Sequence, residues 1–169
     1  KNDSSSLGDW VVDKNKLPNG IEGLLSDAKK HGVKFGIWIE PEMANTTSEL
    51  YEKHPDWVLK ASERDVVLGR GGTQVVLDLA NPAVQDFVFG VADNLITSYT
   101  EIDYIKWDAN MSVQNHGSQY LTKDNQSHMY IEFHRGFEKI CQRIRAKYPD
   151  LTIQACASGG GCAHIRGVG

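Results

Sequence analysis

Apolar residues recur at two different spacings along the first forty residues. Between positions 17 and 31 they stand three or four residues apart, which predicts a helix with one buried face. Gly32 follows directly, and glycine commonly ends helices. From 33 to 40 apolar residues alternate with others, which predicts a strand that Pro41 ends because proline has no amide hydrogen. A helix followed by a strand is therefore expected.

The middle of the chain predicts shorter elements before helical spacing returns. Residues 46–54 suit a short helix, and 63–79 suit two short strands around the glycine-rich turn GRGG. Asn81 and Pro82 form a typical helix start, with apolar residues on one face up to Leu95. The run IDYIKWD, 102–108, predicts the next strand.

The last third repeats the order of helix and strand. A polar loop, 112–126, leads into a long amphipathic helix in which we expect Ile131, Phe137, Ile140 and Ile144 to be buried. The run LTIQAC then predicts a strand that continues into glycines. Helices and strands in alternation indicate an α/β fold with a parallel sheet.

Composition and charge limit the classes of function. With 169 residues, 40% of them hydrophobic, the chain suits one ordinary domain. Its 18 Lys and Arg are scattered among 22 Asp and Glu, for a net charge of −4, which argues against nucleic acid as a partner. No apolar run is long enough to predict a membrane span.

Cysteine, histidine and glycine patterns give no cofactor or metal site. The three cysteines form no CxxC and favour reduced thiols over a disulfide scaffold. The six histidines lack the paired spacing of zinc ligands. GRGG lacks the lysine and hydroxyl residue of a phosphate-binding loop, and ASGGG does not match a dinucleotide fingerprint.

Three predicted strands end in polar or aromatic side chains. In parallel α/β folds the carboxyl ends of strands meet at one edge, where ligand sites form. The three groups would therefore share a pocket: Trp38 with Glu40 and Glu42, Lys106 with Asp108 and Asn110, and Cys156 with Ser158.

Asp108 is the strongest candidate for chemistry. A carboxylate at a strand end can act as nucleophile, base or metal ligand, although many such aspartates only cap a helix or loop. Lys106 and Asn110 share its face, and a cation and an amide beside a carboxylate suit a polyhydroxylated ligand. The charge of Lys106 should also keep Asp108 ionised, because a nearby positive charge lowers the pKa of a carboxyl group. Glu40 and Glu42 could supply a second carboxylate or serve structurally. Trp38 could be core or a stacking wall for a sugar.

These motifs together resemble the catalytic barrel of glycoside hydrolase family 36, the retaining α-galactosidases. The resemblance extends over nearly the whole chain, in order, through SSSLGDW, LPNGIEGL, KFGIWIEPEM, LYEKHPDWVL, VLDLANPAVQDF, YIKWDAN and CASGGG. It implies a partial (β/α)8 TIM barrel, about the third to fifth strands with their helices. Residues 1–169 would then be a fragment of one catalytic domain, cut at both ends.

The resemblance also implies roles for individual residues. Asp108 corresponds to the family's nucleophile. Glu40 and Glu42 would support the residues that touch the sugar. Positions matching sugar-binding residues of the family are Trp38, Arg70, Lys106, Asn110, Cys156, Ser158 and Gly159. The family's general acid/base and its DDGW aspartates match nothing in this chain.

The expected activity is hydrolysis of terminal α-linked galactose from raffinose- or melibiose-type oligosaccharides through a glycosyl-enzyme intermediate. Alternatives are an α-N-acetylgalactosaminidase, a galactosyl transferase or an inert sugar-binding fragment. Without the acid/base, the isolated chain should be inactive. We expect a carbohydrate partner, no cofactor, no metal, no nucleic acid and no membrane. A homo-oligomeric parent and a cytoplasmic or periplasmic location both stay open.

Overall fold

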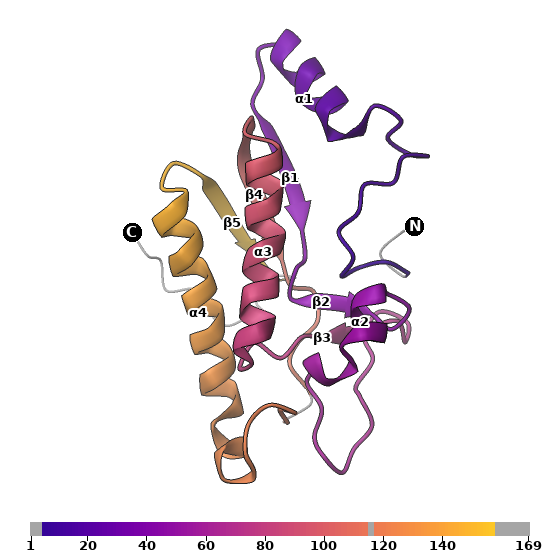
Figure 1. Ribbon diagram of the computed structural model, residues 1–169, viewed down its shortest axis with the longest axis vertical. Coiled ribbons are helices and arrows are strands. Elements are labelled where there is room, and N and C mark those ends of the chain that lie inside the picture. The colour runs from indigo at the N-terminus through magenta and orange to yellow at the C-terminus, as the bar shows by residue number, and fades with distance from the viewer. Residues whose placement is uncertain (1–4, 115–116, 158–169) are drawn as a thin grey trace.

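The computed structural model describes residues 5–114 and 117–157. In chain order (Figure 1), the elements are α1 (Gly20–Lys30), β1 (Phe35–Ile39), β2 (Met43–Asn45), α2 (Glu49–Lys53), the 3-10 helix η1 (Pro55–Trp57), β3 (Gln74–Val76), α3 (Pro82–Ser98), β4 (Ile102–Asp108), the 3-10 helix η2 (Lys123–His128), α4 (Met129–Lys147) and β5 (Thr152–Cys156). Among these, no helix is both long and apolar enough to cross a bilayer.

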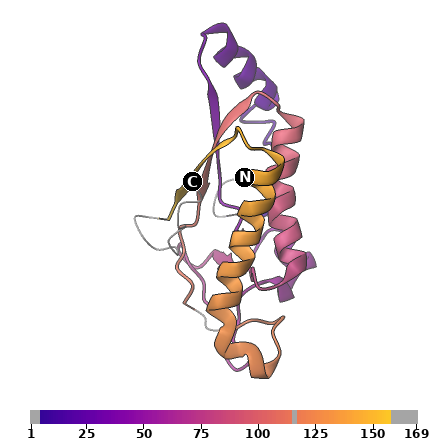
Figure 2. The ribbon, with the colours of Figure 1, turned by 90° about the vertical axis from the view of Figure 1, so that its left-hand side faces the viewer.

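A parallel sheet in the order β1-β4-β5 organises the described part of the chain. Each neighbouring pair is connected through a helix, α3 before β4 and α4 before β5, and both helices cover the same face of the sheet (Figure 2). The α/β class and the parallel sheet predicted from the sequence are confirmed.

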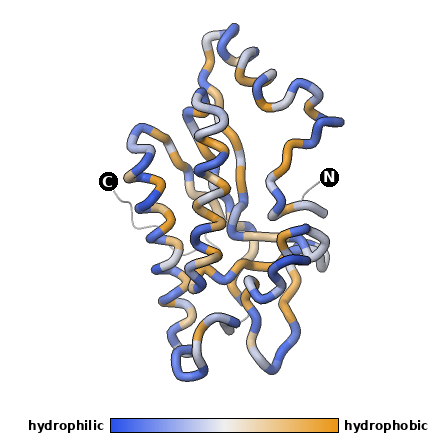
Figure 3. Tube along the Cα trace, viewed as in Figure 1, coloured by the Kyte–Doolittle hydropathy of each residue, from blue (hydrophilic) through white to orange (hydrophobic). Residues whose placement is uncertain are grey.

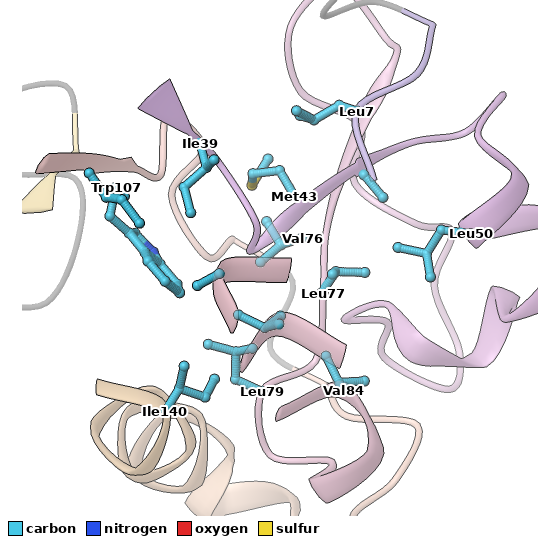
Figure 4. Packing of buried hydrophobic residues seen from close by; sticks show 14 of the residues in the cluster. Leu7, Ile39, Met43, Leu50, Val76, Leu77, Leu79, Val84, Trp107 and Ile140 are labelled. Carbon is cyan, nitrogen blue, oxygen red and sulfur yellow. The ribbon is translucent and has the colours of Figure 1, made fainter. Parts of the chain in front are cut away.

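Burial alternates along β4 because successive side chains point to opposite faces. Ile105 and Trp107 are almost completely buried, and Lys106 between them is half-buried. Trp107 belongs to the core cluster with Leu79, Val84 and Ile140, which Figure 4 shows gathered between the sheet and the helices. The opposite face carries the polar residues.

The start of α3 follows its sequence signals. The Asn81 side chain accepts a hydrogen bond from the Ala83 amide at 2.9 Å, and Pro82 takes the first helical position, where its missing amide hydrogen costs nothing. Val84 and Val88 are fully buried. Polar and apolar positions interchange along α3 and α4 in Figure 3, as expected for helices with one buried face.

The prediction of two strands around GRGG is only partly correct. Gln74–Val76 forms β3, but it pairs antiparallel with β2, and the segment before the turn contributes only one isolated bridge, Gly69 to Gln74. Met43 and Ala44 of β2 are buried, whereas Leu68 is 46% exposed. The strand pairing that removes more apolar surface from water is the one formed.

The predicted buried face of α4 is correct at Ile140 and Ile144, with Phe137 partly buried against the core, and wrong at Ile131. Ile131 is 51% exposed, and the stripe that faces the core consists of Met129, Phe133, Gly136, Ile140 and Ile144. Gly136 allows the closest approach, because a Cβ there would lie 1.9 Å from the carbonyl oxygen of Leu79. The backbone of α4 therefore rests directly on the segment between β3 and α3.

Candidate active site

The carboxylate of Asp108 lies at the carboxyl end of β4, the middle strand of the sheet. Its Oδ2 accepts a hydrogen bond from Trp38 Nε1 at 2.9 Å, and its Oδ1 accepts from the Ala109 amide at 3.1 Å. Cys156 of β5 is its partner across the ladder, and the thiol also hydrogen-bonds to it. Side chains from all three strands thus meet at one carboxylate.

Asp108 is held in its ionised form. Burial by itself raises the pKa of Asp108, but hydrogen bonds from Trp38, Asn110, Cys156 and the Ala109 amide outweigh burial and lower the pKa below its ordinary value. An ionised Asp108 agrees with the sequence-based interpretation, which assigned the effect to Lys106. The larger contributions come instead from neutral donors.

Lys106 lies on the same face of β4 as Asp108. It is half-buried and stands opposite Trp38 of β1 and Gln154 of β5 in the sheet register. A row of three side chains across the sheet therefore borders the carboxylate on the side away from the strand ends. Ser158 and Gly159, which the resemblance also implicated, lie outside the described residues.

Trp38 combines contact with Asp108 and access to solvent. Its side chain is 39% exposed, so the sequence alternative of a core residue does not hold. Trp10 lies against it, with ring centroids 6.4 Å apart and planes tilted by 47°. Sequence reasoning assigned no role to Trp10, although this residue ends the SSSLGDW motif.

Glu40 and Asn110 join the end of β1 to the loop after β4. The backbone amide of Asn110 donates to Glu40 Oε1 at 2.6 Å, although seventy positions separate the two residues. Burial raises the pKa of Glu40, against hydrogen bonds from Asn110, and the nearby Asp108 raises it further. Arg70, at a left-handed φ of 46° in the GRGG turn, is close enough for its charge to oppose this effect.

Glu42 supports the opposite face of β4. Its Oε1 accepts a hydrogen bond from Trp107 Nε1 at 2.7 Å, and both side chains are buried. Burial raises the pKa of Glu42 to about 7, with the Trp107 bond opposing and the neighbouring Glu40 adding to the shift. Glu42 therefore carries a proton for part of the time at neutral pH.

The site is built from one carboxylate with donors, an indole and a half-buried lysine. Trp38, Lys106, Asp108, Asn110 and Cys156 are brought together as predicted from their strand-end positions. Within residues 5–114 and 117–157, no group of three or more His, Cys, Asp or Glu has the geometry to hold a metal ion.

Comparisons with known proteins agree on one family. The family model described as Melibiase matches residues 1–168. Alpha-galactosidase 2 of Pediococcus pentosaceus is 40% identical over 159 residues, which are 94% of this chain and 22% of that protein.

Solved structures give the same result. The α-galactosidase of Lactobacillus brevis superposes with a TM-score of 0.87 at 40% identity, over 94% of this chain and 21% of that one. A variant of the GH36 α-galactosidase AgaA of Geobacillus stearothermophilus, in complex with raffinose, superposes with a TM-score of 0.88 at 37% identity, over 95% of this chain and 22% of that one.

This chain spans about a fifth of the length of the relatives that it matches. These matches cover 94% or more of this chain. The chain therefore belongs to the Melibiase family, and its solved neighbours are glycoside hydrolase family 36 α-galactosidases.

Proposed function

We propose that this chain forms part of the (β/α)8 barrel of a retaining α-galactosidase and supplies its nucleophile, Asp108. The observation that carries the proposal is the environment of this carboxylate. It ends the middle strand, keeps a lowered pKa and meets side chains from both neighbouring strands. A nucleophilic carboxylate needs this state, because the ionised form is a far stronger nucleophile than the neutral acid.

In the first step, a carboxylate oxygen of Asp108 bonds to the anomeric carbon of an α-galactoside. The glycosidic bond breaks, and the leaving oxygen takes a proton from a second carboxyl group. That acid/base matches no residue in these 169 positions, so the rest of the protein must supply it. In the second step, water loses a proton to the same group and displaces Asp108, which retains the anomeric configuration.

The surrounding side chains suit a sugar. The partly exposed ring of Trp38 offers an apolar face against which the C–H face of galactose can stack. Lys106, Asn110 and Arg70 offer donors for hydroxyl groups, and Cys156 stands beside the attacking oxygen. Ser158 and Gly159 remain further candidates. Since relatives have been solved with raffinose and stachyose, we propose galacto-oligosaccharides of this type as substrates.

The direct test is to trap the intermediate in the complete protein that carries this chain. A fluorinated α-galactoside should label Asp108, as peptide mapping by mass spectrometry would show. A label on Glu40 or on any other residue would overturn the assignment.

Activity on a panel of aryl α-glycosides tests the sugar. We expect galactosides to be cleaved best. Preference for N-acetylgalactosaminides, or transfer to an acceptor sugar in place of hydrolysis, would contradict the proposal. The isolated 169 residues, assayed in the same way, should show no turnover.

A further inference from the structure

Two buried carboxylates at the end of β1 reach across to β4 on either side of Asp108. Glu42 accepts from the indole of Trp107, the residue before Asp108, and Glu40 accepts from the amide of Asn110, two residues after it. The segment Glu40-Pro41-Glu42 thus holds β4 and its following loop at two points.

The two carboxylates differ in what their bonds reach. Glu42 binds a side chain that points into the core under the helices, so its bond fixes packing. Glu40 binds the loop that follows the proposed nucleophile, so its bond fixes the site. Only the second contact lies on the reacting face.

The burial of Glu40 destabilises the folded state. Glu40 is 0% exposed, and its Oε2 has no hydrogen-bond partner among the described residues. A buried carboxylate oxygen without a partner costs stability, and such groups are uncommon unless they have a role. A neutral side chain of similar size would destabilise the fold less.

Asn110 connects Glu40 to Asp108. Besides its backbone bond, the Asn110 side chain hydrogen-bonds to both carboxylates. Carboxylates only accept, so the amide nitrogen must be the group that faces each of them. This pattern fixes which way the amide is turned and leaves its oxygen oriented away from both carboxylates.

We infer that Glu40 is a positioning residue that acts through Asn110. It fixes the orientation of the Asn110 side-chain amide relative to Asp108 and to the bound sugar. The inference rests on the proposed function, because it takes Asp108 as the nucleophile. It predicts that removing the Glu40 carboxylate disturbs the reaction by the same route as removing the Asn110 amide.

A double-mutant cycle in the complete protein tests this route. E40M keeps about the length of the side chain but removes both acceptor oxygens, including the Oε1 that accepts from Asn110, and N110A removes the side-chain amide. Each should lower kcat/KM roughly 10- to 100-fold, as for loss of a hydrogen bond to a charged group. The double variant should be no slower than the slower single variant, since the two changes break one connection. Losses that multiply would overturn the inference.

The acidic limb of the pH profile gives a second readout that packing alone would not move. Glu40 faces Asp108, Glu42 and Arg70, and burial raises its pKa, whereas the pKa of Asp108 is lowered. On acidification Glu40 therefore protonates before Asp108, and kcat/KM falls with it. In E40Q the fall should move to lower pH. If the acidic limb stays in place in E40Q but moves in E42Q, the titrating group is Glu42, and the inference is contradicted.

E40D covers the case in which E40M or E40Q does not fold. It keeps a titrating carboxylate but shortens its reach, so turnover should fall while the acidic limb remains. Wild-type turnover equal to that of E40D would contradict a positioning role. If the wild type cleaves only a different glycoside, the proposed function fails, yet the cycle run on that substrate still decides the role of Glu40.

Discussion

Trp107 and Asp108 are neighbours in the sequence but belong to different environments. Trp107 points under the helices, where it contacts Phe137 edge to face, with ring centroids 6.0 Å apart, and donates to Glu42. Asp108 points to the face that the helices leave uncovered and collects donors from β1, β5 and its own loop. Neighbouring residues of one strand thus serve different purposes: Trp107 stabilises the core, and Asp108 belongs to the candidate active site.

The two environments also shift ionisation in opposite directions. Burial dominates for Glu42 and raises its pKa, whereas hydrogen-bond donors dominate for Asp108 and lower its pKa. The neutral form of Glu42 is therefore favoured, whereas the charged form of Asp108 is favoured. Substitutions on the two sides should fail in different ways.

The sharpest contrast is expected from Asp108→Asn in the complete protein. It should reduce kcat at least about 10³-fold, because a neutral amide is a far weaker nucleophile than a carboxylate. Thermal stability should fall by only about 1–3 kcal/mol, since the amide oxygen can still accept from Trp38 or from the Ala109 amide, and only the other donor loses its acceptor. Kinetics on an aryl α-galactoside and a melting curve measure both effects. A variant that melts far below the wild type would place Asp108 on the structural side of the comparison.

The next largest effect concerns the pH dependence that Glu42 gives to stability. Its pKa rises from an ordinary 4.5 to about 7 on folding, so the folded state holds the proton more tightly. The contribution of protonated Glu42 to the free energy of unfolding is fully present below pH 4.5. It is lost as the pH rises toward 7, by about 3 kcal/mol in all. The side chain in E42Q stays neutral, so this variant should become more stable relative to the wild type as the pH rises over this range. Paired melting curves measure the difference. A difference independent of pH would contradict the shift.

Trp107→Phe isolates the hydrogen bond on the core side. The ring keeps its apolar contacts, but Glu42 Oε1 loses its donor, which should cost about 1–3 kcal/mol of stability. The cost should shrink in W107F/E42Q, because the buried group left without a donor is then neutral. Equal costs in the two backgrounds would show that the indole acts by packing alone.

The smallest effect is expected from Trp38→Phe, studied in the E40Q background, where Asp108 sets the acidic limb. Loss of the indole donor should raise the pKa of Asp108 and move the limb to higher pH. The phenyl ring still offers a stacking face, so turnover at neutral pH should fall only slightly. A limb that stays in place would mean that Trp38 does not stabilise the charge.

Sequence reasoning predicted that the candidate residues would lie together because their positions follow from strand periodicity. Asp108 and Lys106 share a face by the period of two, and parallel strands bring Trp38 and Cys156 to the same edge. The start of α3 was equally readable, since Asn81 and Pro82 act within their own turn.

The remaining features depend on contacts between distant segments. Glu40 meets Asn110, and Glu42 meets Trp107, across separations of 70 and 65 residues that no local pattern encodes. Competition for the core decided that β3 pairs with β2, and the close approach of Gly136 to Leu79 centres the buried face of α4 on a stripe that leaves Ile131 exposed. The ionisation of Asp108 was predicted from a charge in the sequence, but it arises from the geometry of neutral donors.

The hydrogen bond between Trp38 and Asp108 also supplies a spectroscopic probe. An indole that donates to a carboxylate changes its fluorescence and its N–H proton resonance when that carboxylate is protonated or esterified. In the complete protein, the signal that disappears in Trp38→Phe identifies this indole. Without any added label, the signal of Trp38 would report in real time whether Asp108 is charged, protonated or covalently occupied.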